Sequence, residues 1–205
     1  MTVDIIIPTY KPDETLCLLL HKLQGQTFVV HRVIILNTEE ELWKQATAAY
    51  PIDQVLKELP CEYEVFHIAK KDFDHGGTRQ FGAEHSDADV MVFMTQDAVP
   101  VDAYLIENLV QAMEEEEAAT AYGRQLPDDT VGVIEHYTRE FNYPAKSYVK
   151  SQKDLETMGI KTYFCSNVCA MYRKDVYEKM GGFVLHTIFN EDMIMASKVI
   201  QAGYK

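Results

Sequence analysis

The chain carries one carboxylate, Asp97, at a place where it could bind a ligand. The five apolar residues at 90–94 are too few for an ordinary helix and suit a strand buried on both faces of a parallel sheet. Ligands of open α/β sheets bind beyond the carboxyl ends of the strands. A carboxylate there can hold a divalent cation, which in turn can hold a diphosphate. A strand-end Asp often only starts a turn or caps a helix. A ligand-binding role for Asp97 therefore depends on other residues that indicate the same site.

Two other polar stretches stand at the ends of predicted elements. Pro8-Thr9-Tyr10 follows the first apolar run, and Asn190-Glu191-Asp192 begins the last predicted helix. Acidic residues are favoured in the first turn of any helix because they complement its dipole. Asp192, however, lies on the same side of the helix as Ala196 and Val199, at the flank of the apolar face. Its side chain is therefore expected to point towards protein rather than water.

The elements that must position these residues alternate between strand and helix. Strands are predicted at 3–7, stopped by Pro8, and at 33–36, 64–68, 90–94 and 168–172. Helices are predicted from Pro12, over 39–49, 52–59 and 77–85, from Asp102, and from near Asn190 to Gly203. The segment 124–163 carries helical pieces and is expected to wrap over the sheet. This order predicts an α/β fold with a doubly wound, mostly parallel sheet.

Composition limits the classes of function. A length of 205 residues favours one domain, and the net charge of −13 argues against nucleic-acid binding and against attachment to an anionic bilayer. An anionic ligand would need local cations or a metal. The four cysteines and seven histidines show no metal-ligand spacing, and the cysteines are interpreted as reduced thiols of a cytoplasmic protein. No signal peptide or membrane-spanning run is present.

The order of the three polar stretches resembles glycosyltransferase family 2, with its GT-A nucleotide-sugar fold. Four further stretches, at 75–79, 122–127, 141–144 and 166–167, are similar to the rhamnosyltransferase branch of that family. The resemblance covers nearly the whole chain. It implies a Rossmann-like, mostly parallel sheet flanked by helices in a single domain over 1–205. Within it, 1–123 would be the nucleotide-sugar-binding half and 124–205 the acceptor-side half.

The same resemblance implies roles for individual residues. Positions matching the nucleotide-sugar site are Pro8, Thr9, Tyr10, Asn37, Arg79, Gln96, Asp97 and Lys198. Three of the matches are incomplete. Asn37 stands where relatives usually carry Asp, Thr95 replaces the first Asp of an Asp-X-Asp metal motif, and Lys198 stands where Arg is usual. Arg79 could equally be a solvated helix charge.

The implied reaction is an inverting sugar transfer. Asp192 matches the catalytic base of the family's Glu-Asp pair, with Glu191 beside it, and Asp97 would hold Mg²⁺ or Mn²⁺. The donor would be a dTDP- or UDP-sugar, with rhamnose the first candidate. The acceptor would be a surface glycan or a lipid-linked one, reached in the cytoplasm or at the inner face of the membrane. A helix N-terminus lowers the pKa of Asp192, whereas burial beside Glu191 raises it, and the sequence leaves the balance open.

Two other functions are alternatives to sugar transfer. The thinned metal motif favours a non-catalytic nucleotide-sugar-binding module or an inactive fragment. A nucleotidyltransferase would need a glycine-rich, lysine-bearing phosphate loop after the first strand, and residues 9–12 form no such loop. The alternation of elements predicts another strand after Lys205, so we expect this chain to be part of a longer protein. A metal-binding histidine that relatives often carry beyond the Glu-Asp helix would lie in that part.

Overall fold

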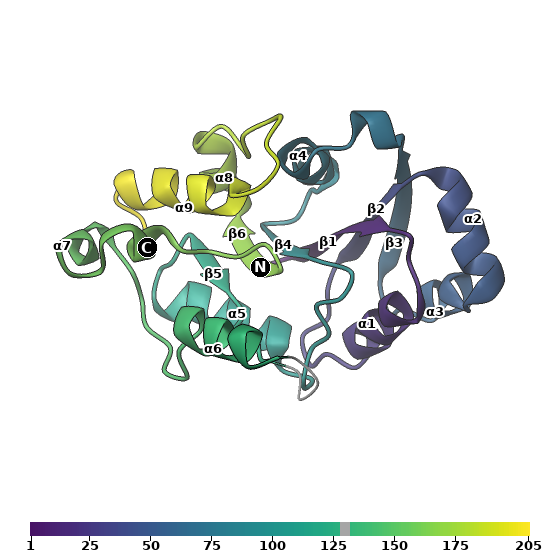
Figure 1. The fold of residues 1–205 in the computed structure, drawn as a ribbon, viewed down its shortest axis with the longest axis horizontal. Helices are drawn as coiled ribbons and strands as arrows, with labels where there is room; N and C mark the ends of the chain where they lie inside the picture. Colours follow the sequence, from purple (N-terminus) through teal and green to yellow (C-terminus); the bar gives the residue numbers. More distant parts are fainter. Residues whose placement is uncertain (128–131) are drawn as a thin grey trace.

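A computed structural model describes residues 1–127 and 132–205. Its centre is a sheet with the strand order β3-β2-β1-β4-β6-β5 (Figure 1). The strands are β1 (Val3–Tyr10), β2 (Arg32–Thr38), β3 (Glu62–Ile68), β4 (Val90–Met94), β5 (Thr120–Tyr122) and β6 (Cys169–Arg173). The first four are parallel, whereas β6 is antiparallel to β4 and β5. The predicted mostly parallel α/β sheet is confirmed.

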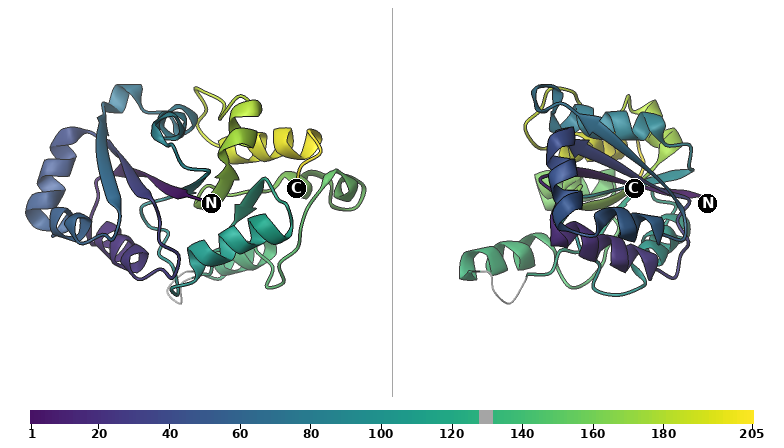
Figure 2. Two further views of the ribbon diagram at one scale, coloured as in Figure 1. Left: turned by 180° about the vertical axis from the view of Figure 1, so that it is seen from behind. Right: turned by 90° about the vertical axis from the view of Figure 1, so that its right-hand side faces the viewer.

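Helices cover both faces of the sheet, as the two views of Figure 2 show. The helices of the described residues are α1 (Glu14–Gln24), α2 (Glu40–Ala49), α3 (Ile52–Lys57), α4 (His75–His85), α5 (Leu105–Glu115), α6 (Val133–Asn142), α7 (Leu155–Met158), α8 (Lys174–Lys179) and α9 (Glu191–Gln201), and α6 and α7 bury no side chain. Side chains of β1 alternate, so that Ile5 and Ile7 pack with α1, α3 and α5, while Ile6 packs with α4, α8 and α9. Among the described helices, each is too short or too polar to span a bilayer.

Several predicted boundaries differ from the structure: the helix predicted over 77–85 begins at His75, the one predicted over 52–59 ends at Lys57, and three further differences have a local reason. Pro8 lies inside β1 because pairing with β4 ends at Ile6, so the missing N–H of Pro8 faces no ladder on that side. The helix predicted from Pro12 begins at Glu14, after Asp13 accepts a hydrogen bond from the Thr15 N–H at 2.9 Å. The helix predicted from Asp102 begins at Leu105, because the Asp102 carboxylate first forms a turn with the Tyr104 N–H.

The segment at 124–163 adds no strand in its described part, as expected. The strand just before it, β5, was missed. It has three residues, which is too few for a periodic signal, and it pairs only with β6.

The start of α4 is fastened to the loop that leads into α9. Asp74 caps α4 by accepting a hydrogen bond from the Gly77 N–H at 2.7 Å, and the same oxygen accepts one from the His186 N–H at 3.2 Å. A Cβ on Gly76 would lie 1.8 Å from the Val184 carbonyl oxygen. The glycine therefore allows the loop backbone to pass against the helix.

Replacement of Gly76 by alanine should separate these two segments. A new methyl group cannot share space with a backbone carbonyl, so we expect a loss of about 1–3 kcal/mol in the free energy of unfolding, despite alanine's better helix propensity. Gly25→Ala is the control, because the nearest atom to its Cβ is 3.9 Å away and its φ is −88°. Urea denaturation of both variants provides the measurement. Equal stability of the two variants would contradict the packing argument.

Candidate active site

The ends of β1 and β4 meet at the carboxyl edge of the parallel strands. Gln96, just past β4, accepts a hydrogen bond from the Tyr10 N–H at 3.0 Å and donates one to the Tyr10 carbonyl at 3.2 Å. This side chain therefore joins the two chain segments beyond the last backbone pair of these strands, which is Ile6 with Phe93. Asp97 follows directly and is exposed at this edge. Tyr10, Gln96 and Asp97 therefore lie at the same edge of the sheet, and the Gln96 side chain joins the two chain segments there.

The Asn37 side chain supports the end of β1 from within the protein. It is fully buried, accepts a hydrogen bond from the Thr9 hydroxyl at 3.3 Å and donates one to the Glu39 carbonyl at 3.0 Å. The amide nitrogen also lies 3.1 Å from Nδ1 of His67. Asn37 and Thr9 therefore have no free surface for a nucleotide, and Pro8 is half-buried. These residues support the loop rather than form its face.

Tyr10 is the accessible member of this loop. Its side chain is 40% exposed, and the ammonium groups of Lys11 and Lys70 lie 5.4 and 5.6 Å from the ring centroid. An aromatic face can stack on a nucleobase, and the two lysines place positive charge at an edge of a strongly acidic chain. Lys70 comes from the turn after β3, and no short motif in the sequence indicated it.

Asp192 lies in the first turn of α9 and is half-buried. One carboxylate oxygen accepts a hydrogen bond from the Asn167 backbone N–H at 3.1 Å, and the other accepts one from the Met193 N–H at 2.7 Å. Burial raises the pKa of Asp192 above its ordinary value, against the lowering effect of the Asn167 N–H, and the adjacent Glu191 carboxylate adds to the rise. The balance that the sequence left open is thus decided by burial.

A pocket of about 380 Å³ opens beside Asp192. Its walls come from the start of α9, from α6 and from the segment before β6. They combine hydrogen-bonding side chains with aromatic rings: Gln125, Glu135, Thr138, Arg139, Asn142, Tyr143, Phe164, Cys165, Ser166, Asn190, Asp192 and Met193. Sugars are bound by such combinations of rings and planar polar groups. α6 projects to one side of the body (Figure 2), so this wall stands away from the sheet.

Glu191 is turned into the protein instead of the pocket. It is 5% exposed, and one carboxylate oxygen lies 3.2 Å from an Arg79 guanidinium nitrogen and 3.2 Å from the Asn167 amide nitrogen. Arg79 is buried as well and also donates to the His75 carbonyl. The alternative of a solvated helix charge at Arg79 is therefore wrong.

Lys198 is likewise engaged with protein atoms. Its ammonium donates hydrogen bonds to the carbonyls of Met180 at 3.1 Å and Gly182 at 3.3 Å, which closes the turn after α8.

A larger cavity of about 650 Å³ lies between α5, β5, α9 and the segment 142–165. It includes neither Asp97 nor Asp192. The Lys150 ammonium at its wall donates hydrogen bonds to the Tyr122 hydroxyl at 3.2 Å, to the Lys161 carbonyl at 3.5 Å and to the Phe164 carbonyl. Burial lowers the pKa of Lys150 to about 8. All three amine hydrogens have protein partners, so Lys150 connects this segment to β5.

The sequence comparisons decide the family. Residues 4–181 match Glycosyl transferase family 2. The chain belongs to this family. It is 42% identical over 206 aligned positions to the O-antigen chain rhamnosyltransferase RfbN of Salmonella typhimurium, covering 100% of this chain and 63% of RfbN. It is also 42% identical over 139 positions to the O-antigen chain rhamnosyltransferase WbaN of Salmonella anatum, covering 67% of this chain and 44% of WbaN. The chain thus spans less than two thirds of the length of these curated relatives.

Solved structures confirm the GT-A fold of this family 2 glycosyltransferase chain. S. aureus TarS 1–349 in complex with UDP-GlcNAc superposes with a TM-score of 0.69 at 16% identity, covering 98% of this chain and 53% of TarS. The mannosyltransferase PcManGT of Pyrobaculum calidifontis, in complex with GDP-Man and Mn²⁺, gives a TM-score of 0.63 at 15% identity, covering 99% and 53%. At such identities the likeness shows the fold alone.

The divalent ion that the family resemblance implies fits Asp97. Mg²⁺ and similar ions are commonly held by one or two carboxylates together with substrate phosphates and water. Asp97 offers one exposed carboxylate, and the nearby Thr95 hydroxyl is buried without a hydrogen-bond partner in the described parts of the chain. A site of this kind is completed by the ligand.

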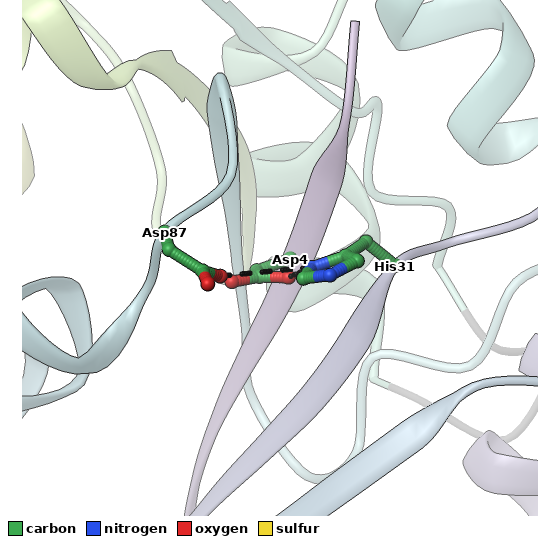
Figure 3. A group of neighbouring side chains, drawn as sticks. All are labelled: Asp4, His31 and Asp87. Atoms are coloured by element: carbon green, nitrogen blue, oxygen red, sulfur yellow. Dashed lines mark hydrogen bonds and ion pairs between the residues drawn. The ribbon is translucent and has the colours of Figure 1, made fainter.

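A second group of possible metal ligands lies at the opposite edge of the sheet. Figure 3 shows Asp4, His31 and Asp87 drawn together, with the His31 Nδ1 atom 2.8 Å from Asp4. A guanidinium nitrogen of Arg32 lies 3.2 Å from Asp4 and 2.8 Å from Asp87. The Ser86 hydroxyl also donates to Asp4 at 2.8 Å. The positive charge that a metal would supply is already supplied by Arg32, so we interpret this group as an ion-pair cluster. No histidine spacing in the sequence indicated it.

Loss of the Asp4 charge should be costly, because Asp4 is fully buried in this cluster. We expect Asp4→Asn to lower the free energy of unfolding by about 3 kcal/mol, since Arg32 retains other acidic partners, whereas the exposed Asp87→Asn should cost less than about 1 kcal/mol.

The same cluster predicts a pH dependence. The hydrogen bond with Asp4 raises the pKa of His31, so His31 stabilises the fold fully below its unfolded pKa, and this contribution is lost as pH rises through the folded pKa. The dependence should weaken in Asp4→Asn, where Asp87 is left as the acidic neighbour of His31. Urea denaturation at several pH values measures both effects, and equal costs for the two substitutions would contradict the interpretation.

Proposed function

We propose that this chain is the catalytic domain of an inverting glycosyltransferase. It transfers a sugar, with rhamnose the first candidate, from a nucleoside diphosphate to a hydroxyl of a surface glycan or lipid-linked glycan. The observation that carries the proposal is the position of Asp192, a carboxylate whose pKa burial raises and which lines a pocket of about 380 Å³ walled by hydrogen-bonding side chains and aromatic rings. The names of the two relatives that are 42% identical support the rhamnosyl donor and the O-antigen type of acceptor.

The donor is assigned to the carboxyl edge of β1 and β4. Tyr10 would stack on the base, while Thr9, Pro8 and Asn37 keep its loop in place from beneath. Asp97 would hold Mg²⁺ or Mn²⁺, whose charge stabilises the leaving diphosphate. Gln96 orients Tyr10 through its two backbone hydrogen bonds. The neighbouring structures bind UDP-GlcNAc and GDP-Man with Mn²⁺, which supports a nucleotide sugar as donor; dTDP and UDP are the proposed nucleotides here.

The acceptor is assigned to the pocket beside Asp192. Its hydroxyl oxygen attacks the anomeric carbon, the bond between that carbon and the phosphate oxygen breaks, and the electron pair leaves with the diphosphate. The hydroxyl proton moves to a carboxylate oxygen of Asp192. A raised pKa suits this step, because a general base works best when its pKa approaches the working pH. A single displacement of this kind inverts the anomeric centre.

The two halves of the chain would then divide the work. Residues 1–123 contribute the donor side, and 124–205 contribute the acceptor side through α6, the segment before β6 and α9. In this proposal Glu191, Arg79 and Lys198 act from within the protein, since each has protein partners. An acceptor joined to a lipid would place the reaction at the cytoplasmic face of a membrane.

The rival is a module that binds nucleotide sugar without turning it over. Asp97 is a single carboxylate at the predicted metal position, and this favours the rival. A metal held by one carboxylate depends on the diphosphate and on water for its remaining ligands. A variant that separates donor binding from transfer distinguishes the two.

Asp192→Asn is that variant. Asn is nearly isosteric and is tolerated near a helix start, so the fold and donor binding should survive. Transfer should fall by about 10²-fold or more, the usual contribution of a positioned base. Donor binding is measured as the thermal stabilisation by dTDP or UDP with Mg²⁺, where a ligand at a hundred times its dissociation constant adds about 2.7 kcal/mol. Transfer is measured as the initial rate from the dTDP- or UDP-sugar.

Asp175→Asn is the matched control. Asp175 is exposed in the first turn of α8, where it complements a helix dipole without a pocket beside it. This substitution should cost only about 0.3–1 kcal/mol in stability and leave transfer intact. Near-normal transfer by Asp192→Asn, at unchanged nucleotide affinity, would exclude Asp192 as the base. Donor binding without any transfer by the unmodified protein would favour the binding module.

A further inference from the structure

A buried row of hydrogen bonds connects the core of the sheet to the reactive carboxylate. The Tyr172 hydroxyl donates to the Asn167 side-chain oxygen at 2.8 Å, and the Asn167 amide nitrogen donates to Glu191 at 3.2 Å. Glu191 in turn pairs with Arg79 of α4 at 3.2 Å. Tyr172, Asn167, Glu191 and Arg79 are each at most 6% exposed. In such an interior a hydrogen bond is strong and a missing partner is costly, so the row has one preferred arrangement.

Asn167 occupies the centre of this row and contacts both acids of the pair. Its side chain holds Glu191, while its backbone N–H donates to Asp192 at 3.1 Å. The amide can satisfy the row in one orientation only. If it were flipped, its oxygen would face the Glu191 carboxylate and its nitrogen would face the Tyr172 hydroxyl. Residue 167 is therefore locked, and with it the direction of the N–H that points at Asp192.

Tyr172 provides the fixed end. Its ring is 1% exposed and packs edge-on against Phe93, Tyr177 and Phe183, with centroid distances of 5.7, 6.1 and 5.6 Å. A ring held on these sides cannot swing, so its hydroxyl has a defined position. Besides Asn167, the hydroxyl lies 3.4 Å from the sulfur of Cys165.

We propose that Asn167, locked by Tyr172, is a positioning residue that sets the orientation and basicity of Asp192. This inference rests on the proposed function, in which Asp192 is the base. Asn167 does not take up the proton itself. It holds Asp192 through its backbone and keeps Glu191 directed to Arg79 through its side chain.

The charges around Asp192 give the direction of the effect. Glu191 lies beside it on α9 and Arg79 faces it from α4, while Cys165 and Tyr172 lie on the β6 side and Tyr143 and Arg139 on the α6 side. The Asn167 N–H lowers the pKa of Asp192, since it donates to the ionised form. A loosened residue 167 therefore raises that pKa further and misaligns the oxygen that accepts the proton.

Tyr172→Phe tests the lock with the removal of a single oxygen atom. The matched control is Tyr177→Phe, which removes a hydroxyl from the same aromatic cluster. That hydroxyl donates to Gln80 at 2.7 Å, accepts from the Phe183 N–H at 3.1 Å and has no bond to Asn167 or to either acid. Each variant loses the hydrogen bonds of one buried hydroxyl, so both should lose about 1–2 kcal/mol of stability. Only Tyr172→Phe should disturb Asp192.

Two readouts follow Asp192. In ¹³C NMR of the labelled carboxylates, the titration midpoint of Asp192, assigned with Asp192→Asn, should move upwards in Tyr172→Phe and stay in place in Tyr177→Phe. In the transfer assay, kcat should fall about 10- to 100-fold in Tyr172→Phe, the scale expected for a misplaced catalytic group, and the acid limb of its pH profile should move in the same direction. The thermal stabilisation by dTDP or UDP should not change.

A second variant covers the case in which Tyr172→Phe repacks. Asn167→Ala deletes both side-chain bonds and should shift the Asp192 midpoint upwards at least as far. Equal midpoints in Tyr172→Phe and Tyr177→Phe, or an unmoved midpoint in a folded Asn167→Ala protein, would overturn the inference. The NMR readout needs no turnover. If the midpoint shifts in a protein that transfers no sugar, the proposed function fails and the positioning role stands.

Discussion

The burial of two adjacent carboxylates at the start of α9 is the constraint on which the rest of this site depends. Two like charges removed from water would repel each other and destabilise the fold unless one is neutralised. Arg79 pairs with Glu191, so Asp192 can remain a base with a raised pKa. This arrangement requires α4 to lie against the approach to α9, which is the contact that Gly76 and Asp74 make possible. It also requires the segment before β6 to bring Asn167 to the helix N-terminus.

The two edges of the parallel sheet have opposite roles. At the amino edge, Asp4 is surrounded by His31, Arg32 and Ser86, which joins β1 to β2 and to the connection before β4. The acidic groups of that cluster are already paired with Arg32, so a bound cation would add no positive charge that the cluster lacks. At the carboxyl edge, Asp97 and Tyr10 remain accessible, and Gln96 connects the ends of the two strands there. The amino edge is thus closed by ion pairs, whereas the carboxyl edge exposes Asp97 and Tyr10. This difference suits a metal site at the carboxyl edge whose remaining ligands come from the substrate.

Sequence patterns predicted the parts of this structure that depend on local order. The apolar run of β4 and the polar residues after it located the carboxyl edge, and the position of Asp192 beside the apolar face of α9 predicted its burial. The patterns could not show which long-range partner satisfies each polar group. Asn37 was expected to meet a nucleotide and instead binds Thr9, while Lys198 binds the turn after α8. The role of Asn167 depends on Tyr172, which is five residues away across a strand start, and on α9, which no local pattern relates to it.

We expect the donor and the metal to bind at the carboxyl edge of the sheet, between Tyr10 and Asp97. A crystal structure of the protein with Mn²⁺ and dTDP or UDP, with the metal located by its anomalous scattering, tests this claim directly. We expect a manganese peak within coordination distance of Asp97 and of the diphosphate, with the base against Tyr10. A peak among Asp4, His31 and Asp87, or a nucleotide bound away from this edge, would contradict it.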